Sequence, residues 1–88
     1  MTLVGRVASA VLVRDDAAGP VASFAVAVAR PGSDDMDVVP VTARGAPVVS
    51  SVRALGPGSP VSVDARLAPT GDGLAVVAHA VHAFGPSR

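Results

Sequence analysis

Alternation of bulky and small side chains is the strongest pattern in the chain, and it is longest over residues 21–30 (Val-Ala-Ser-Phe-Ala-Val-Ala-Val-Ala-Arg). Phe24, Val26 and Val28 fall on one face of a strand, and the other face carries small residues. Gly-Pro precedes this stretch and Pro-Gly follows it, so it begins and ends sharply. The pattern predicts a strand in the middle of a closed or stacked sheet, with Phe24, Val26 and Val28 turned inward.

Four further strands follow from the same reasoning. They are predicted at residues 2–14, 36–44, 61–67 and 74–84. Gly5 predicts a bend or bulge in the first of them, and Pro40, which lacks an amide donor, places the third at an edge or a bulge. The last strand alternates poorly, which indicates burial on both faces or a bulge.

The period changes over residues 45–55, which predict a short helix. Val48, Val52 and Leu55 are spaced i, i+4 and i+7 and share one helical face. A proline suits the first turn, and Gly56 suits the position just after the last. No Ser, Thr or Asp caps the start, so we expect about two turns held by packing.

The predicted order is three strands, a helix and two strands, in a single domain over residues 1–88. An open α+β sheet with this order leaves its edges exposed, and the chain has no Lys to guard them. A closed barrel removes most of the edge. We therefore predict an all-β fold: a five-stranded Greek-key barrel of the oligonucleotide/oligosaccharide-binding (OB) type, with one short helix between strands three and four.

The amino-acid composition limits the kinds of core and of binding site that the chain can form. Half of the residues are apolar, but only Phe24 and Phe84 are aromatic; we expect Phe24 in the core and Phe84 in the core or at an interface. The chain has no Cys, and seven arginines balance seven aspartates. The N-terminus lacks the pattern of a secretory signal, and no apolar run is long enough to span a membrane. We expect a cytoplasmic protein that does not bind membranes.

Candidate catalytic or metal-binding groups are few. His79 and His82 are three residues apart, so they face opposite sides of a strand unless a bulge intervenes, and a metal would need a carboxylate from elsewhere. Asp34, Asp35 and Asp37 lack the spacing of a cation loop and predict a solvated loop. We expect no enzyme activity, no metal and no cofactor.

Several segments together resemble the bacterial single-stranded-DNA-binding protein family, in register over nearly the whole chain. Residues 3–6 (Leu-Val-Gly-Arg) are similar to its first strand, and residues 21–30 are similar to its second. The other matching segments are residues 38–45, 55–61, 63–67 and 76–81. No single motif is decisive; their order and spacing carry the likeness. The resemblance implies the OB fold, binding of single-stranded DNA in replication, repair or recombination, and assembly into a homodimer or homotetramer.

This chain departs from the family at the positions that stack bases. The family binds single strands on aromatic rings together with a basic groove. By the register of the resemblance, Val38 and Arg44 occupy third-strand positions where the family has aromatics. The family also continues into a long tail with an acidic tip, whereas this chain ends at residue 88. The resemblance thus implies a divergent, tailless member.

The resemblance implies weak binding of single-stranded DNA through contacts of arginines with the DNA backbone. The arginines expected to make these contacts are Arg6, Arg30, Arg44 and Arg66. Arg44 either stacks through its guanidinium or is an exposed arginine at a strand end. The small outward residues of the second strand are where a base or a neighbouring subunit would lie.

The alternative is an OB-fold module for oligomerisation or protein interaction that has lost nucleic-acid binding. The missing aromatics and the zero net charge favour it, and edge pairing of residues 2–13 would join the subunits. A primosomal accessory protein of the same lineage lies between the two hypotheses.

Overall fold

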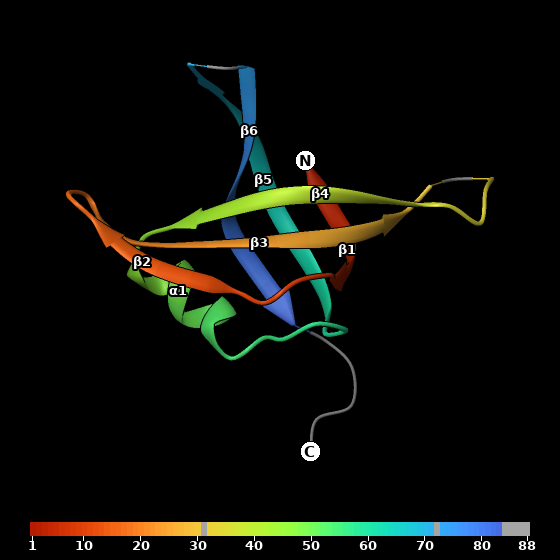
Figure 1. The fold of residues 1–88 in the computed structure, drawn as a ribbon, viewed down its shortest axis with the longest axis horizontal. Coiled ribbons are helices and arrows are strands. Elements are labelled where there is room, and N and C mark those ends of the chain that lie inside the picture. The colour runs from red at the N-terminus through yellow and green to blue at the C-terminus, as the bar shows by residue number, and fades with distance from the viewer. Residues whose placement is uncertain (31, 72, 84–88) are drawn as a thin grey trace.

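Short strands and one helix account for most of the chain in the computed structural model, which describes residues 1–30, 32–71 and 73–83 (Figure 1). Within these ranges the elements are β1 (Thr2–Val7), β2 (Leu12–Asp16), β3 (Gly19–Ala29), β4 (Met36–Arg44), α1 (Ala46–Arg53), β5 (Pro60–Thr70) and β6 (Gly73–Ala83). Phe84, which we expected in the core or at an interface, lies outside the described residues.

The strands close into a barrel. β1 pairs with β5 on one side and with β3 on the other; β3 pairs with β4, β4 with β6, and β6 with β5 again. Every pairing is antiparallel except the parallel one between β4 and β6. With β1 and β2 as two parts of the first barrel strand, this order confirms the predicted five-stranded OB barrel with a short helix between its third and fourth strands.

The first barrel strand is interrupted at residues 8–11, so the prediction of one continuous strand over residues 2–14 is wrong there. Ala8 donates its amide hydrogen to the Ala25 carbonyl at 2.8 Å, and the Ser9 hydroxyl accepts the Ala25 amide hydrogen at 2.9 Å. A side chain thus replaces a backbone carbonyl in the ladder, which releases the backbone around Ser9. Before the break, β1 pairs mainly with β5; after it, β2 pairs with β3 along its whole length.

Gly5 lies within β1 and not at the interruption. A β-carbon on Gly5 would lie 2.0 Å from the carbonyl oxygen of Ala27 on β3, far inside van der Waals contact. Only glycine allows β1 to come this close to β3, next to the Arg6–Ala27 pairing at which the barrel closes.

The core is built mainly from valine and alanine. Val26, Val61 and Val63 are fully buried, and Phe24 is 5% exposed, which confirms its expected place in the core. Val28 is partly buried and packs against this core, on the same face of β3. The opposite face of β3 is turned outward, as the alternation predicts.

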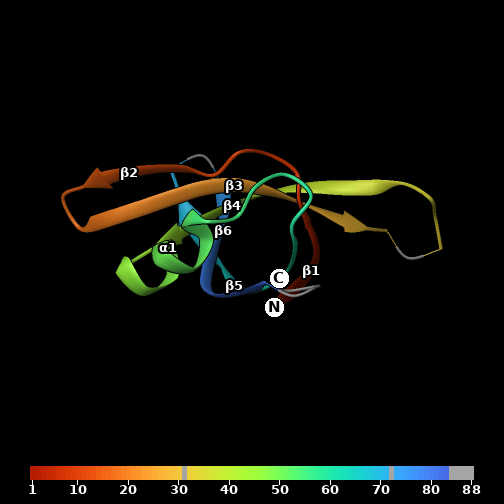
Figure 2. The same ribbon diagram turned by 90° about the horizontal axis from the view of Figure 1, so that it is seen from below.

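Helix α1 covers one end of the barrel, on the side away from the layer of β2, β3 and β4 (Figure 2). It follows Gly45, which has a φ of 96°, and has a proline in its first turn but no side-chain cap. Val49 and Val52 are its buried residues, whereas Val48 is only partly buried. The buried face is thus rotated slightly from the predicted one. Among the described residues, no helix is long and apolar enough to cross a membrane.

Pro40 lies where its missing amide hydrogen is not needed. It pairs with Ala25, whose own amide and carbonyl groups bond to Ser9 and Ala8 rather than to β4. The pairing of β4 with β6 begins only at Val41. Pro40 therefore faces β6 before that ladder starts, which confirms the predicted edge position.

β6 contains the irregularity that its blurred alternation predicts. The pairing with β5 shifts register between Asp64 and Ala65, which face Ala80 and Ala78, so His79 is the extra residue of a bulge. Beyond the pairing with β4, β5 and β6 continue as a two-stranded arm that projects from the barrel (Figure 1).

Candidate nucleic-acid interface

The outer face of β2, β3 and β4 is a three-stranded sheet surface on the side away from α1 (Figure 2). Successive rows of cross-strand neighbours define it. One row runs Arg14–Val21–Arg44, and the next runs from Leu12 through β3, β4 and β6 to Arg66 on β5. Because paired residues point to the same side of a sheet, each row lies on one surface.

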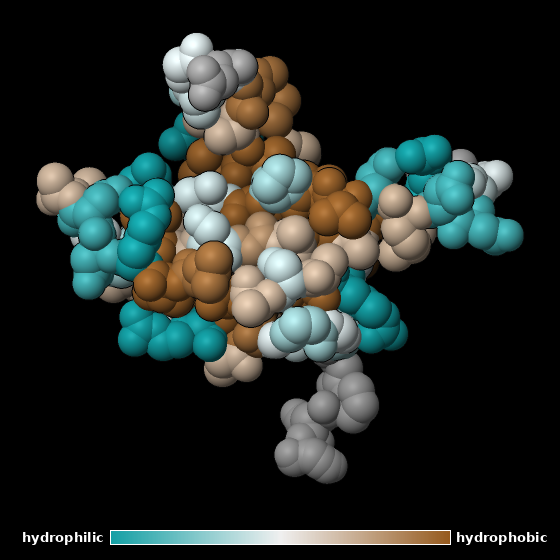
Figure 3. All heavy atoms as spheres, viewed as in Figure 1, coloured by the Kyte–Doolittle hydropathy of each residue, from teal (hydrophilic) through white to brown (hydrophobic). Residues whose placement is uncertain are grey.

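The centre of this face is mainly apolar, and no described residue there carries an aromatic ring. Leu12 is 68% exposed and Val38 is 62% exposed, and Ala25, Ala27 and Pro40 lie between them. In the middle of the face in Figure 3, hydrophobic residues lie among residues of intermediate hydropathy, and hydrophilic side chains gather at both ends of β3 and β4. A nucleobase on this face would meet aliphatic and small side chains, not a stacking platform.

Two of the four predicted arginines come together with a third. Arg14 and Arg44 flank Val21, two strand spacings or about 10 Å apart. Arg66 lies one row further on and two strands across from Arg44, about 12 Å away along the sheet. We call Arg14, Arg44 and Arg66 the arginine line.

Arg6 and Arg30 lie away from the arginine line. Arg6 is the neighbour of Ala27, six residues or about 20 Å from Val21 along β3, and it donates to the Gly58 carbonyl at 2.9 Å. Arg30 is at the far end of β3, about 30 Å from Val21. Its guanidinium pairs with Asp37 at 2.6 Å and with Asp35 at 3.7 Å.

Arg44 also has a carboxylate partner. Its Nη1 lies 3.0 Å from Oδ2 of Asp16, whose other oxygen accepts the Ala18 amide hydrogen at 2.9 Å. This backbone hydrogen bond, followed by the contact with Arg44, lowers the pKa of Asp16. Arg14 and Arg66 make no hydrogen bond or ion pair within the part of the chain that the structure describes.

Sequence reasoning missed Arg14. The alternation Leu12, Arg14, Asp16 at the end of the first barrel strand was the signal available, because it places all three side chains on one face. The break at residues 8–11 leaves this alternation in phase, because the even-numbered residues of β1 are also the exposed ones.

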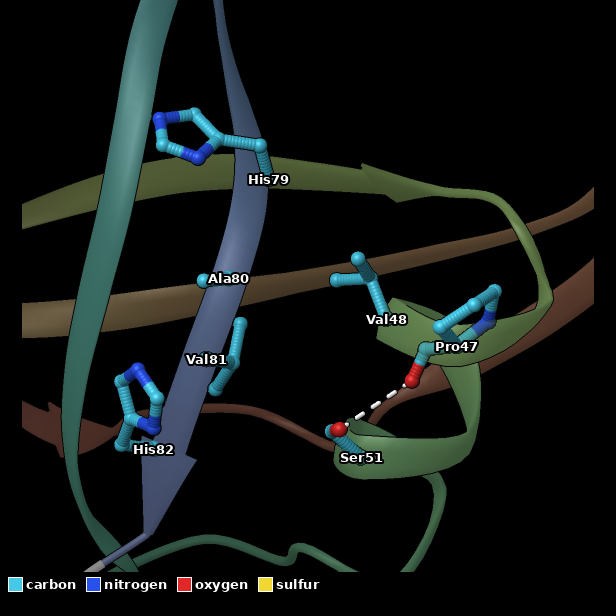
Figure 4. Close-up of a pocket in the computed structure, with 7 residues that line it drawn as sticks. All are labelled: Pro47, Val48, Ser51, His79, Ala80, Val81 and His82. Carbon is cyan, nitrogen blue, oxygen red and sulfur yellow. Dashed lines mark hydrogen bonds between the residues drawn. The ribbon is translucent and has the colours of Figure 1, made fainter.

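The bulge in β6 brings the two histidines to the same pocket. His79 and His82 line a pocket of about 260 Å³ together with Pro47, Val48 and Ser51 of α1 (Figure 4). Nε2 of His82 lies 4.0 Å from Oδ2 of Asp64. Among residues 1–30, 32–71 and 73–83, no group of three or more His, Cys, Asp or Glu side chains is placed to hold a metal ion.

Two aspartates at the start of β4 and in the loop before it have an ordinary structural role. Asp35 and Asp37, in the stretch considered as a cation loop, are partners of Arg30. The turn at residues 56–59 is closed by hydrogen bonds between Gly56 and Ser59, and it joins α1 to β5.

The barrel and its exposed sheet face define the class of protein: an OB-fold protein. The small single-stranded DNA-binding protein from Streptomyces coelicolor superposes with a TM-score of 0.77 at 30% identity, covering 96% of this chain and 90% of that one. This chain therefore belongs to the single-stranded DNA-binding protein family. No family model and no curated protein matches the sequence.

Two more distant solved structures share the fold. The dimeric N-terminal domain of PriB protein from Thermoanaerobacter tencongensis has a TM-score of 0.80 at 22% identity, over 98% of this chain and 96% of that one. The mitochondrial single-stranded DNA-binding protein Rim1 from S. cerevisiae has a TM-score of 0.81 at 20% identity, over 100% and 95%.

Proposed function

We propose that this protein binds single-stranded DNA, without catalysis, as an accessory of replication, repair or recombination. The observation that carries the proposal is the end-to-end match at 30% identity with the single-stranded DNA-binding protein from Streptomyces coelicolor. The exposed face of β2, β3 and β4 supports it, because this face combines an accessible apolar centre with cationic side chains.

In the proposed mode, phosphates contact arginines while the bases lie over the apolar centre. Arg44 and Arg66 contribute with Arg14 at one end of the face, and Arg6 contributes along its side. Arg30 takes part only when a phosphate displaces its two carboxylate partners. Stacking on an aromatic ring contributes about 1–3 kcal/mol per base in related proteins, so binding without one is weak and depends on the phosphate contacts.

Fluorescence anisotropy of a labelled 35-nucleotide oligo(dT) tests the proposal. We expect saturable binding at low salt with a Kd of about 1–100 µM, and weaker binding to a duplex of equal length. An anisotropy that stays flat at low salt and several hundred micromolar protein would refute DNA binding.

Substitutions test whether the arginine line is the contact surface. Arg44→Ala combined with Arg66→Ala is expected to weaken binding about tenfold, since two phosphate contacts are removed. Arg53→Ala is the control for the loss of one charge, because Arg53 is exposed in the last turn of α1, on the side away from the proposed face. Since the double variant loses two charges, a fall in log K only about twice that of Arg53→Ala would mean that net charge alone, and not this face, attracts the DNA.

We also propose that the protein forms a homodimer or homotetramer through β1. Met1 exchanges two backbone hydrogen bonds with Ala65, and the Val7 amide donates toward the β5 side, to Ser59. The odd-numbered residues of β1 thus direct their backbone amide and carbonyl groups to β5. Thr2 and Val4 direct theirs to the other edge of the strand. Pairing with β3 begins only at Arg6, which leaves that edge open, and the Val4 side chain is 56% exposed.

Light scattering after size-exclusion chromatography tests self-association. Val4→Pro removes an amide hydrogen at the open edge but none from the β1–β5 ladder, so we expect the oligomer to dissociate. Val4→Thr keeps both the amide and the branched shape, and is expected to stay oligomeric. A wild-type protein that is monomeric at all concentrations would overturn this proposal. An oligomer that binds no DNA would instead favour a pure oligomerisation module.

A further inference from the structure

Asp16 is anchored on the outer face of the barrel at the arginine line. One oxygen of its carboxylate accepts the Ala18 amide hydrogen in the β2–β3 turn, and the other contacts Arg44 at 3.0 Å. The Asp16 side chain is 29% exposed, whereas that of Arg44 is 51% exposed. The turn thus fixes the carboxylate, while about half of the Arg44 side chain stays exposed to solvent.

Arg14 lies on the same face, two residues before Asp16 on β2. Val21 separates it from Arg44 in the row, and Val21 is only 1% exposed. The register places the aliphatic stems of the two arginines to cover Val21, with their charged ends toward solvent. Asp16 therefore contacts the guanidinium of Arg44 and lies on the same face as Arg14, whose charge also favours its ionised form.

We propose that the Asp16 carboxylate occupies the position of a DNA phosphate at a subsite formed by Arg44 and Arg14, and that a phosphate displaces it from Arg44 on binding. This inference rests on the proposed function. Carboxylate and phosphate oxygens accept the same guanidinium hydrogen bonds, so one replaces the other without rearrangement of the arginine. The hydrogen bond from Ala18 holds the turn after the exchange.

The charge balance favours exchange at this end of the face rather than at the other. On the outer face, Arg14 and Arg44 lie beside one aspartate, Asp16, because Asp15 pairs with Pro20 and points to the opposite face of the sheet. Around Arg30, one arginine is surrounded by the three aspartates of residues 34–37, and two of them already contact it. An incoming phosphate is repelled there, so Asp16 is the carboxylate whose displacement admits DNA.

Asp16→Asn tests the proposal, because the asparagine oxygen can still accept the Ala18 hydrogen bond but no longer competes with a phosphate as a charge. We expect oligo(dT) to bind about fivefold more tightly at low salt, and the plot of log K against log salt to steepen by about 0.7. Asp15→Asn is the matched control: it changes net charge equally, but Asp15 has no contact with Arg44. We expect it to change affinity by less than about twofold.

A second substitution separates the effect of the freed Arg44 guanidinium from the effect of net charge. Adding Arg44→Ala to Asp16→Asn is expected to remove the gain in affinity, because the freed guanidinium is its source. Thermal melting checks that each variant is folded, and Asp16→Ser, whose hydroxyl also accepts from Ala18, repeats the test if the asparagine variant is not.

Failure of the proposed function and failure of this inference alone give different results. If neither the wild type nor Asp16→Asn binds DNA at low salt, the proposed function falls and this inference falls with it. If the wild type binds and Asp16→Asn behaves like Asp15→Asn, the function stands and Asp16 is not a competitor of phosphate.

Discussion

Gly5 sets how closely β1 approaches β3, and this makes one methyl group decisive. In Gly5→Ala the new β-carbon would lie 2.0 Å from the Ala27 carbonyl oxygen, which is backbone and cannot rotate away. We expect the free energy of unfolding to fall by about 2–3 kcal/mol, as for an overpacked core. Urea denaturation followed by circular dichroism measures it. Gly56→Ala, where the added carbon meets open space, is the control and is expected to change stability by less than about 0.5 kcal/mol.

The single residue Asp16 also makes the stability of the fold depend on pH. Its folded-state pKa is lowered, first by the Ala18 hydrogen bond and then by Arg44, so the charged carboxylate stabilises the fold above the unfolded pKa, near 4. That contribution is lost as the pH falls below about 4 and through the lower folded value. The stability difference between wild type and Asp16→Asn is therefore expected at pH 7 and absent near pH 2. A difference that persists at pH 2 would mean that Asp16 acts through the turn alone.

At the scale of elements, α1 depends on packing because it lacks a side-chain cap. Val52 is fully buried beneath it, and Val52→Ala leaves a cavity expected to lower the free energy of unfolding by about 2 kcal/mol. Val48→Ala has the same gain in helix propensity but removes a partly buried side chain, so its loss is expected to be smaller. Equal losses in denaturant melts would show that Val48 and Val52 are equally important to the packing.

The elements also show how much of the fold local sequence patterns can predict. Alternation predicts β3, β4 and β5 because each keeps one face against the core. Helix α1 ends at Arg53 with Ala54 as its C-cap, so the predicted end before Gly56 is two residues too late. The break at residues 8–11 was not predictable, since it depends on Ser9 meeting Ala25, sixteen positions later in the chain. The bulge at His79 was foreseeable only as blurred alternation, because its place depends on the register with β5.

At the scale of the whole molecule, the zero net charge limits long-range attraction of DNA. Only local phosphate contacts then contribute, and Arg6, Arg14 and Arg66 offer three. Arg44 adds little because it exchanges the Asp16 carboxylate for a phosphate. Each of the first three contributes about 0.7 to the salt dependence of single-strand binding, so we expect log K to fall against log salt with a slope of about −2. Anisotropy titrations between 20 and 300 mM NaCl, values chosen to span the useful range of screening, measure the slope. A slope of about −5 or steeper would require phosphate contacts well beyond these arginines.

The sequence by itself determined the period of each strand, the place of the helix, the burial of Phe24 and, through its resemblance, the barrel topology. These properties depend on residues a few positions apart in the sequence, where a period of two or of 3.6 residues can be recognised. Only the tertiary structure decided that Arg14, Arg44 and Arg66 share one surface and that Arg6 and Arg30 lie apart from it. Side chains from different strands become neighbours through the pairing register, and that register is set by barrel closure rather than by any local period.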